Sequence, residues 1–418
     1  MNWMLDLQAL LGIGAFVLLA LPFSSHIRGI RWRIVAAAII LQFAICYVLL
    51  RVPVISNALQ YLNKGVAALS SATKAGTSFV FGYVGGATPP FAITNPAALS
   101  TFAFQVIPII IVVSALSAVL WYWRILPVII HAIAWFFERT LGTRGPAGFA
   151  VTANVFVGQV EAPLLVRPYI SRMTRYELLL MMTAGMAMIA GSMMVVYSSM
   201  LASHFDNMLS QLLTKSLMSI PASILFAYVM LPDDTQSAEH AEPGRLYGST
   251  MDAITRGTTD GLHIWLNVIA ILIVLIAFVA LLNFGLQTLP DVAGAPLSLE
   301  RMIGWLFAPL AWLMGIPWNE ATTAGSLLGI KTALNEFIAY LKLADLGPGT
   351  LSPRTRLITI YALCGFANFS SMGIQISGIA AMAPDRRADL NALAFRSLVG
   401  ATLASCMTGA VVGIVEFF

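Results

Sequence analysis

The chain has 418 residues, of which 59% are hydrophobic and only 10% are charged, and its net charge is +4. A soluble globular protein carries about 25% charged residues, so this composition excludes an ordinary soluble fold and indicates an integral membrane protein. The basic residues lie between apolar runs and form no cluster with aromatic side chains, which argues against a nucleic-acid partner. The three cysteines lie inside apolar runs and imply no disulfide framework.

Apolar runs long enough to cross a bilayer recur along the chain, since a spanning helix needs about 20 such residues. The sequence predicts eight spanning helices, at residues 7–23, 34–50, 105–123, 176–203, 208–231, 262–289, 357–380 and 390–417. The first run has no basic segment before it and no cleavage site after it, which favours a helix over a signal peptide. The amphipathic segment 124–138 is predicted to lie along the membrane interface.

Two further apolar stretches, at about 148–170 and 322–343, are interrupted by polar residues around Glu161 and Glu336. Both are rich in Gly, Ala, Asn and Thr. Irregular backbone at membrane depth is tolerated only where protein or a water-filled cavity satisfies its polar groups. Both stretches are therefore predicted to be re-entrant helical hairpins that dip into the membrane and return.

The two interrupted stretches belong to an internal repeat. Each precedes an apolar run with its own polar break: Glu161 precedes Ser192 by 31 residues, and Glu336 precedes Asn368 by 32. Paired discontinuous segments in corresponding halves are the best sequence indicator of a transporter's binding site. The predicted fold is an all-α membrane protein with about eight transmembrane helices, two re-entrant helical hairpins and inverted repeats.

The distribution of basic residues predicts the orientation of the chain in the membrane. Arginines gather at three points taken as cytoplasmic, namely Arg28, Arg31, Arg33, Arg167, Arg172, Arg175, Arg386, Arg387 and Arg396. With eight crossings, both termini then lie outside. The polar segment 232–260 is predicted to be a solvated cytoplasmic loop, and no separate soluble domain is expected.

The buried acids are the first candidates for chemistry. A carboxylate at bilayer depth costs a few kcal/mol or more unless it is paired or hydrated, so Glu161 and Glu336 are predicted to be functional. The structural alternative is that they cap amides of the hairpin backbone.

Amides and a hydroxyl accompany the two acids. Gln159 and Asn368 both donate and accept hydrogen bonds, and Ser371 offers a hydroxyl. This mixture suits a neutral ligand with amide-like edges and hydroxyl groups. Phe366 is predicted to stack on a flat ring, the alternative being simple packing. Asn154 and carbonyls of the broken helix are candidates for a small cation, although Asn154 equally suits a hairpin cap.

Several motifs are absent from the sequence. There is no G-x-x-x-x-G-K-[ST] phosphate loop and no H-E-x-x-H motif, and the five histidines are scattered. No cofactor is predicted. Transport is expected to draw its energy from an ion gradient.

Three long motifs resemble signatures of the concentrative nucleoside transporter family. They are Gly158-Gln159-Val160-Glu161-Ala162-Pro163-Leu164-Leu165-Val166-Arg167-Pro168-Tyr169, Leu334-Asn335-Glu336-Phe337 and Cys364-Gly365-Phe366-Ala367-Asn368-Phe369-Ser370-Ser371-Met372-Gly373-Ile374-Gln375. The run Gly76-Thr77-Ser78-Phe79-Val80-Phe81-Gly82 fits as well. Their order and length make the resemblance specific over nearly the whole chain beyond the first helices.

The resemblance implies a homotrimer of a bacterial inner membrane that imports a uridine-like nucleoside with sodium, or with a proton, by an elevator movement. It implies scaffold helices at 1–123 and 261–300 and transport-domain halves at 124–231 and 301–418.

The resemblance also assigns roles to the candidate residues. Gln159 and Glu161 would face the base, whereas Glu336, Asn368 and Ser371 would hold the ribose, with Phe366 beside it. The residues that match the sodium site, largely through backbone carbonyls, are Asn154, Val157 and Ile189.

Two positions depart from the family pattern. Val160 stands where relatives usually carry Thr or Ser, which removes one base contact. Met188 stands where relatives usually carry Ser or Thr, which removes a sodium-ligating hydroxyl and keeps proton coupling open. Two other classes of function stay open on the residues alone: an intramembrane enzyme that uses Glu161 and Glu336 as an acid–base pair, and a channel lined by the polar breaks.

Overall fold

The computed structural model describes residues 3–93, 99, 101–143, 145–201, 207–233, 246–292, 294–347 and 349–417. These residues form helices joined by turns, and the only extended pairing among them is an isolated bridge between Val292 and Ala295. The prediction of an all-α fold is confirmed.

Seven spans in the described part of the chain are long and apolar enough to cross a membrane. Their helices are α1 (Trp3–Ala20), α2 (Trp32–Arg51), α4 (Ile109–Tyr122), the broken pair α9 (Arg175–Ala187) and α10 (Gly191–Leu201), α11 (Met208–Met230), α12 (Thr250–Leu286) and α18 (Arg387–Phe417). Each overlaps a predicted run. The eighth predicted run, 357–380, is divided between α16 (Pro353–Leu363) and α17 (Phe369–Met382).

Both predicted hairpins are helical and turn at the predicted polar residues. Hairpin 1 (residues 145–170) consists of α6 (Gly145–Ala153), α7 (Glu161–Leu165) and α8 (Arg167–Ile170). Hairpin 2 (residues 318–345) consists of α14 (Trp318–Ala333) and α15 (Glu336–Asp345). In each hairpin the first limb ends just before the tip, and the glutamate is the first residue of the next helix.

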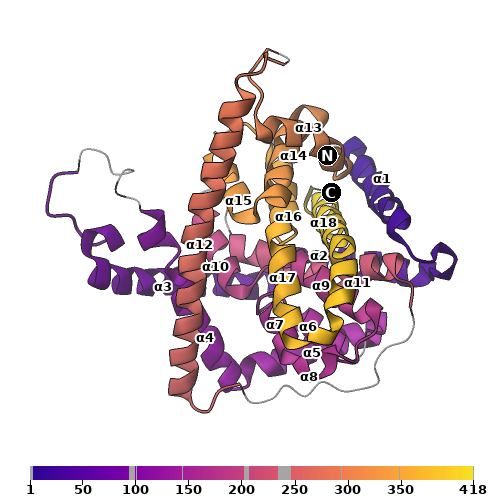
Figure 1. Ribbon diagram of the computed structural model, residues 1–418, viewed down its shortest axis with the longest axis horizontal. Helices are drawn as coiled ribbons and strands as arrows, with labels where there is room; N and C mark the ends of the chain where they lie inside the picture. Colours follow the sequence, from indigo (N-terminus) through magenta and orange to yellow (C-terminus); the bar gives the residue numbers. More distant parts are fainter. Residues whose placement is uncertain are drawn as a thin grey trace.

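The structure contains helices that the sequence did not predict. α3 (Pro53–Phe81) follows α2 directly and projects away from the bundle, at the left of Figure 1. α13 (Leu299–Leu313) precedes hairpin 2 and is bent by 117° relative to α14. The amphipathic segment predicted at the interface is α5 (Ile125–Leu141).

The prediction that residues 232–260 form a loop is wrong for the second part of this segment. α12 begins at Thr250, where the Ser249 hydroxyl accepts a hydrogen bond from the Asp252 amide and so caps the helix. Because the first turns of α12 are polar, the sequence predicted a loop where a long helix begins. Residues 234–245 of the loop lie outside the described residues, and so do its acids Asp234, Glu239 and Glu242.

The core and the periphery of the bundle differ in burial. α18 lies in the middle of the bundle and packs against α1, α9, α11 and α16, and 78% of its apolar window is buried. α12 runs along one side (Figure 1), packs closely on α4 and leaves most of its surface exposed, with only 11% of its window buried. Gly257 and Gly261 allow this close approach, because a Cβ on either would clash with the α4 backbone. The exposed apolar surface of α12 is suited to lipid or to another subunit.

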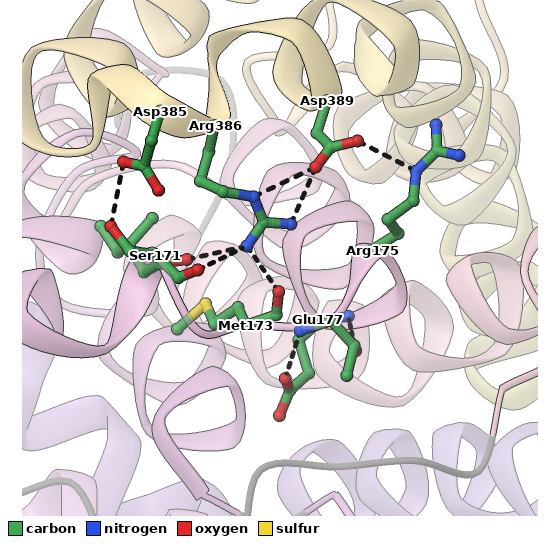
Figure 2. Close-up of polar contacts among 9 residues, drawn as sticks. Ser171, Met173, Arg175, Glu177, Asp385, Arg386 and Asp389 are labelled. Carbon is green, nitrogen blue, oxygen red and sulfur yellow. Dashed lines mark hydrogen bonds and ion pairs between the residues drawn. The ribbon is translucent and has the colours of Figure 1, made fainter.

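A polar clamp, made by Arg386 and the residues that it binds, joins the end of hairpin 1 to the start of α18 (Figure 2). The Arg386 guanidinium donates hydrogen bonds to three carbonyls, those of Ile170 at 3.2 Å, Ser171 at 3.2 Å and Met173 at 2.6 Å. The same guanidinium pairs with the Asp389 carboxylate at 3.0 Å. The clamp therefore ties together segments that lie more than 200 residues apart in the sequence.

A buried ion pair holds α1 against the second repeat. The Arg354 guanidinium, at the start of α16, lies 2.7 Å from the Asp6 carboxylate of α1, and both side chains are less than 10% exposed. The Phe417 ring lies 5.8 Å from the same guanidinium, so the first and last helices meet at one end of the bundle. Nearby, the Gln8 amide donates to the carbonyls of Trp312 and Ile316.

Breaking this pair tests how α1 is attached. Asp6→Leu leaves the Arg354 charge buried without a partner, and we expect it to lower the free energy of unfolding by about 3 kcal/mol. The double variant Asp6→Leu, Arg354→Met replaces both charges by apolar groups and should recover most of the loss. Melting temperatures in detergent measure both effects. An unchanged melting temperature in the single variant would show that the pair does not hold α1.

Candidate functional site

The two broken helices meet at their breaks. The Phe366 amide, in the α16–α17 break, donates to the Met188 carbonyl in the α9–α10 break at 3.2 Å. Gly365 has a φ of +150°, and a Cβ at this position would lie 2.6 Å from the Ala187 carbonyl oxygen. Only glycine fits such a conformation and approach. The contact places four helix ends of the two repeats at one point of the buried core.

Glu336 is the centre of a hydrogen-bonded cluster at this point. Its side chain is 5% exposed, and the Tyr197 hydroxyl of α10 donates to its Oε1 at 2.8 Å. The Asn368 amide nitrogen donates to its Oε2 at 3.0 Å. Glu336 is also the first residue of α15, where the partial positive charge of the helix N-terminus favours a carboxylate. The cluster joins hairpin 2 to both broken helices.

Both polar atoms of the Asn368 side-chain amide are hydrogen-bonded. Its Oδ1 accepts the Ser371 backbone amide at 2.7 Å and so caps α17, while its nitrogen binds Glu336. Asn368 and Ser371 are 1% and 6% exposed. The structure thus brings together the three residues predicted to hold the ribose, and Asn368 is hydrogen-bonded to the other two.

The tip of hairpin 1 forms a second group around Gly185 of α9. A Cβ on Gly185 would lie 2.3 Å from the Gln375 amide nitrogen and 3.2 Å from the Gln159 Cβ, so both glutamines converge there. The Gln375 nitrogen donates to the Met182 carbonyl at 3.2 Å. The side-chain oxygens of Gln159 and Gln375 are buried and find no hydrogen-bond partner among the described residues. Buried acceptors without a donor are rare and mark a place for a ligand or an ordered water.

Glu161 and Phe366 have a different environment from the buried amides. The Glu161 side chain is exposed and that of Phe366 is half-buried, although both belong to segments at the centre of the protein. Val160 packs against Gly378 of α17, where a Cβ would lie 2.8 Å from the valine side chain. Glu161 and Phe366 are therefore the more accessible of the predicted site residues, whereas Gln159 and Glu336 are buried.

The residues predicted for sodium lie where hairpin 1 meets the first break. The Gly191 amide donates to the Phe156 carbonyl at 3.1 Å, which joins the hairpin tip to the start of α10. Asn154 is 2% exposed, and its amide nitrogen has no hydrogen-bond partner in the described structure. Ile189 is fully buried and Val157 is half-buried. The unwound carbonyls beside a helix C-terminus provide oxygen ligands of the kind a small monovalent cation takes.

The described residues contain no group of three or more His, Cys, Asp or Glu side chains that could hold a metal ion. Met188 has no hydroxyl, and its carbonyl accepts the Phe366 amide at 3.2 Å.

Sequence reasoning missed four polar residues of the site. Tyr197 and Gln375 lie within helices, and nothing in their spacing distinguishes them from packing residues. Lys215 and Lys331 are 0% and 2% exposed and lie in apolar runs. The rule that an ionisable residue at membrane depth is functional identified the glutamates and, applied to these lysines, would have identified them too.

Paired hairpins, paired broken helices and a buried polar cluster where they meet define the class of secondary transporters. Models of the family described as Na+ dependent nucleoside transporter match residues 11–84 (N-terminus) and 211–413 (C-terminus), and a model described as nucleoside recognition matches residues 103–204.

Individual relatives agree with the family models. The chain is 33% identical to the nucleoside permease NupC of Helicobacter pylori, over 98% of this chain and 97% of that protein. It is 34% identical to sodium/nucleoside cotransporter 1 of Mus musculus, over 98% of this chain but only 64% of the longer mouse protein. A solved structure of CNTnw in an inward-facing substrate-bound state superimposes with a TM-score of 0.89 at 33% identity, covering 99% of this chain and 98% of that one.

The chain belongs to the Na+-dependent, or concentrative, nucleoside transporter family. The resemblance predicted from the three motifs is thereby confirmed. Because members of this family are transporters, the prediction that the chain is not an enzyme is confirmed as well, and neither the enzyme nor the channel alternative is favoured.

The crossing of the two breaks gives a prediction with an internal control. Gly365→Ala places a methyl group against the Ala187 carbonyl in a strained conformation, and we expect a melting temperature several degrees lower and a loss of substrate binding. Gly373→Ala, a few residues further on in α17, meets no atom within 4 Å and should leave the melting temperature equal or higher. Thermal unfolding of both variants in detergent measures the difference. Equal melting temperatures would contradict the close approach of Gly365 to the Ala187 carbonyl.

Proposed function

We propose that the chain is a secondary active importer that carries a uridine-like nucleoside together with sodium, driven by the sodium gradient. The observation that supports this most strongly is the Glu336 cluster, in which hairpin 2 and both broken helices meet on one carboxylate. A carboxylate and an amide held this way match vicinal hydroxyl groups. The family to which the chain belongs is consistent with such a substrate.

The ribose would bind Glu336 from the site's accessible side. Each carboxylate oxygen accepts one side-chain hydrogen bond, and the ribose hydroxyls would donate to the lone pairs that remain. The Ser371 hydroxyl and the second hydrogen of the Asn368 amide complete the set. Hydrogen bonds to a charged group contribute about 1.5–3 kcal/mol each, so most of the affinity would come from this end.

The base would lie towards hairpin 1. The unpartnered oxygen of Gln159 accepts a hydrogen bond, and the imide N–H of a uracil ring would donate one. Phe366, half-buried at the break, offers its ring face or edge to the nucleoside. Glu161, exposed at the accessible side, would bind further donors of the base. Val160 contributes only packing at its position.

Sodium would bind between hairpin 1 and the first break, through Asn154 and the carbonyls of Val157 and Ile189. The bond from Gly191 to the Phe156 carbonyl already joins these two segments. A cation placed there would order the hairpin tip and with it Gln159, which lies five residues after Asn154 and two after Val157. Binding of the cation would therefore complete the base end of the nucleoside site. A proton on Glu161 or Glu336 is the alternative coupling ion.

The chain would carry its ligands by an elevator movement, with α12, the least buried of the spans, in the part that stays fixed. We assign residues 124–231 and 301–418 to a moving transport domain and residues 1–123 and 261–300 to a scaffold. The Arg386 clamp would keep hairpin 1 and α18 together during the movement. The exposed apolar surface of α12 would form the contact between three copies in a bacterial inner membrane, with both termini outside.

The ribose assignment gives a direct prediction. Glu336→Gln keeps the size of the side chain but removes its charge, and we expect nucleoside binding to weaken at least about tenfold. Tyr197→Phe removes only one donor to Glu336 and should have a smaller effect. Asp345→Asn, at the other end of α15, is the matched control and should bind normally. Equilibrium binding of labelled uridine to purified protein measures all three, and full affinity in Glu336→Gln would refute the assignment.

A further inference from the structure

The connection between α1 and α2, residues 21–31, is held against two other helices of the bundle. The Arg31 amide donates to the Tyr228 hydroxyl of α11 at 3.2 Å. The Phe23 ring lies 6.2 Å from the Phe395 ring of α18. These contacts fix the inner side of the connection and leave its outer side to the surroundings of the protein.

The outer side of this connection is apolar and basic at once. Ile27 is 52% exposed, and Trp32, the first residue of α2, is 53% exposed. Arg28 and Arg33, which follow them in the sequence, are exposed as well. Phe395, at the ring contact with the connection, is 56% exposed. Aromatic and basic side chains in such close succession are typical of the boundary between membrane and water.

The arginines of this region have no carboxylate partner. None of the ion pairs in the described part of the chain includes Arg28, Arg33 or Arg396 of α18. By contrast, Arg175 at the start of α9 is paired with Asp389 at 3.2 Å. Arg396 is half-buried, and the long side chain of an arginine can extend along an apolar surface to place its charge at the interface. Three guanidinium groups are therefore available to an anion from outside the chain.

We propose that this region, the arginine surface, binds an anionic phospholipid. The arginine surface consists of Ile27, Arg28, Trp32, Arg33, Phe395 and Arg396. A guanidinium binds a phosphate through two parallel hydrogen bonds, and the exposed apolar side chains beside it suit acyl chains. A phospholipid offers both parts in one molecule, whereas free phosphate offers only the first.

The place of the arginine surface in the membrane supports a lipid as its ligand. Arg28, Arg33 and Arg396 belong to segments predicted to face the cytoplasm. Anionic lipids of the cytoplasmic leaflet attract basic segments that lie next to spanning helices. Binding of such a lipid does not depend on which solute or ion the chain carries.

A bound headgroup would also stabilise the fold. A phosphate shared by Arg396 and either arginine of the connection would join the start of α2 to α18, as the contact between Phe23 and Phe395 joins the end of α1 to it. The lipid would thus act on the same pair of segments that this ring contact holds together. The melting temperature of the protein should therefore depend on the charge of the lipid.

The test measures the melting temperature of purified, delipidated protein in detergent, with added phosphatidylglycerol or phosphatidylcholine, which differ in the charge of the headgroup. We expect a rise of several degrees with phosphatidylglycerol and a clearly smaller rise with phosphatidylcholine. In the triple variant Arg28→Gln, Arg33→Gln, Arg396→Gln, the phosphatidylglycerol concentration that gives half of the rise should increase at least about tenfold.

The matched control is the triple variant Lys64→Gln, Lys74→Gln, Arg139→Gln. It lowers the net charge by the same amount through exposed residues of α3 and α5, and it should respond to phosphatidylglycerol as the wild type does. Inorganic phosphate, added alone, is expected to leave the melting temperature of the wild type unchanged. If the arginine variant is too unstable to purify, native mass spectrometry of Arg28→Gln and Arg396→Gln counts the retained phosphatidylglycerol, and each should retain less than the wild type.

Three results would overturn the assignment. The first is an equal rise with both lipids in the wild type, and the second is an unchanged phosphatidylglycerol response in the arginine variant or an equal loss in the control. The third is a rise of the same size with inorganic phosphate, because an anion without acyl chains would then be sufficient. In the mass-spectrometric measurement, retention equal to the wild type in both single variants would contradict it as well.

Discussion

The structure depends on one constraint: when a helix is interrupted inside a membrane, its freed backbone groups must find partners within the protein. Here two interruptions are placed against each other. The Phe366 amide binds the Met188 carbonyl, Asn368 caps α17, and the two buried lysines cover the carbonyls of Ala187 and Ala362. The buried side-chain atoms that stay without a partner beside the breaks, on Asn154, Gln159 and Gln375, are in our account the ones left for ligands.

The same groups that satisfy the backbone of the breaks also link the two hairpins to the broken helices. Glu336 of hairpin 2 accepts hydrogen bonds from α10 and from the α16–α17 break, so one carboxylate connects hairpin 2 to both broken helices. Hairpin 1 is joined to α10 through the Phe156 carbonyl and to α18 through the Arg386 clamp. In our account, ligand and cation complete this network from its two open ends, which makes the loaded state the one best suited to cross the membrane interior.

Much of this arrangement could be predicted from the sequence, because long apolar runs and acids within them are strong signals. The hairpins, seven of the spans and the positions of Glu161 and Glu336 follow from these signals alone. α3 was missed because it is amphipathic and too polar for a spanning helix, and the start of α12 because its first turns are polar. Tyr197 and Gln375 could not be predicted, since their roles arise only when distant helices pack together. Lys215 and Lys331 could have been predicted, because they too are ionisable groups at membrane depth, but the rule was used only for the acids.

The central claim is that a sugar-bearing solute and sodium bind at the crossing of the two breaks and move together. The most direct measurement is uptake of labelled uridine into proteoliposomes that contain the purified protein, with equal inward gradients of sodium, potassium or protons. The account predicts accumulation above the external concentration with the sodium gradient alone, abolished when a sodium ionophore collapses it. Failure to accumulate any nucleoside under all three gradients would contradict the account.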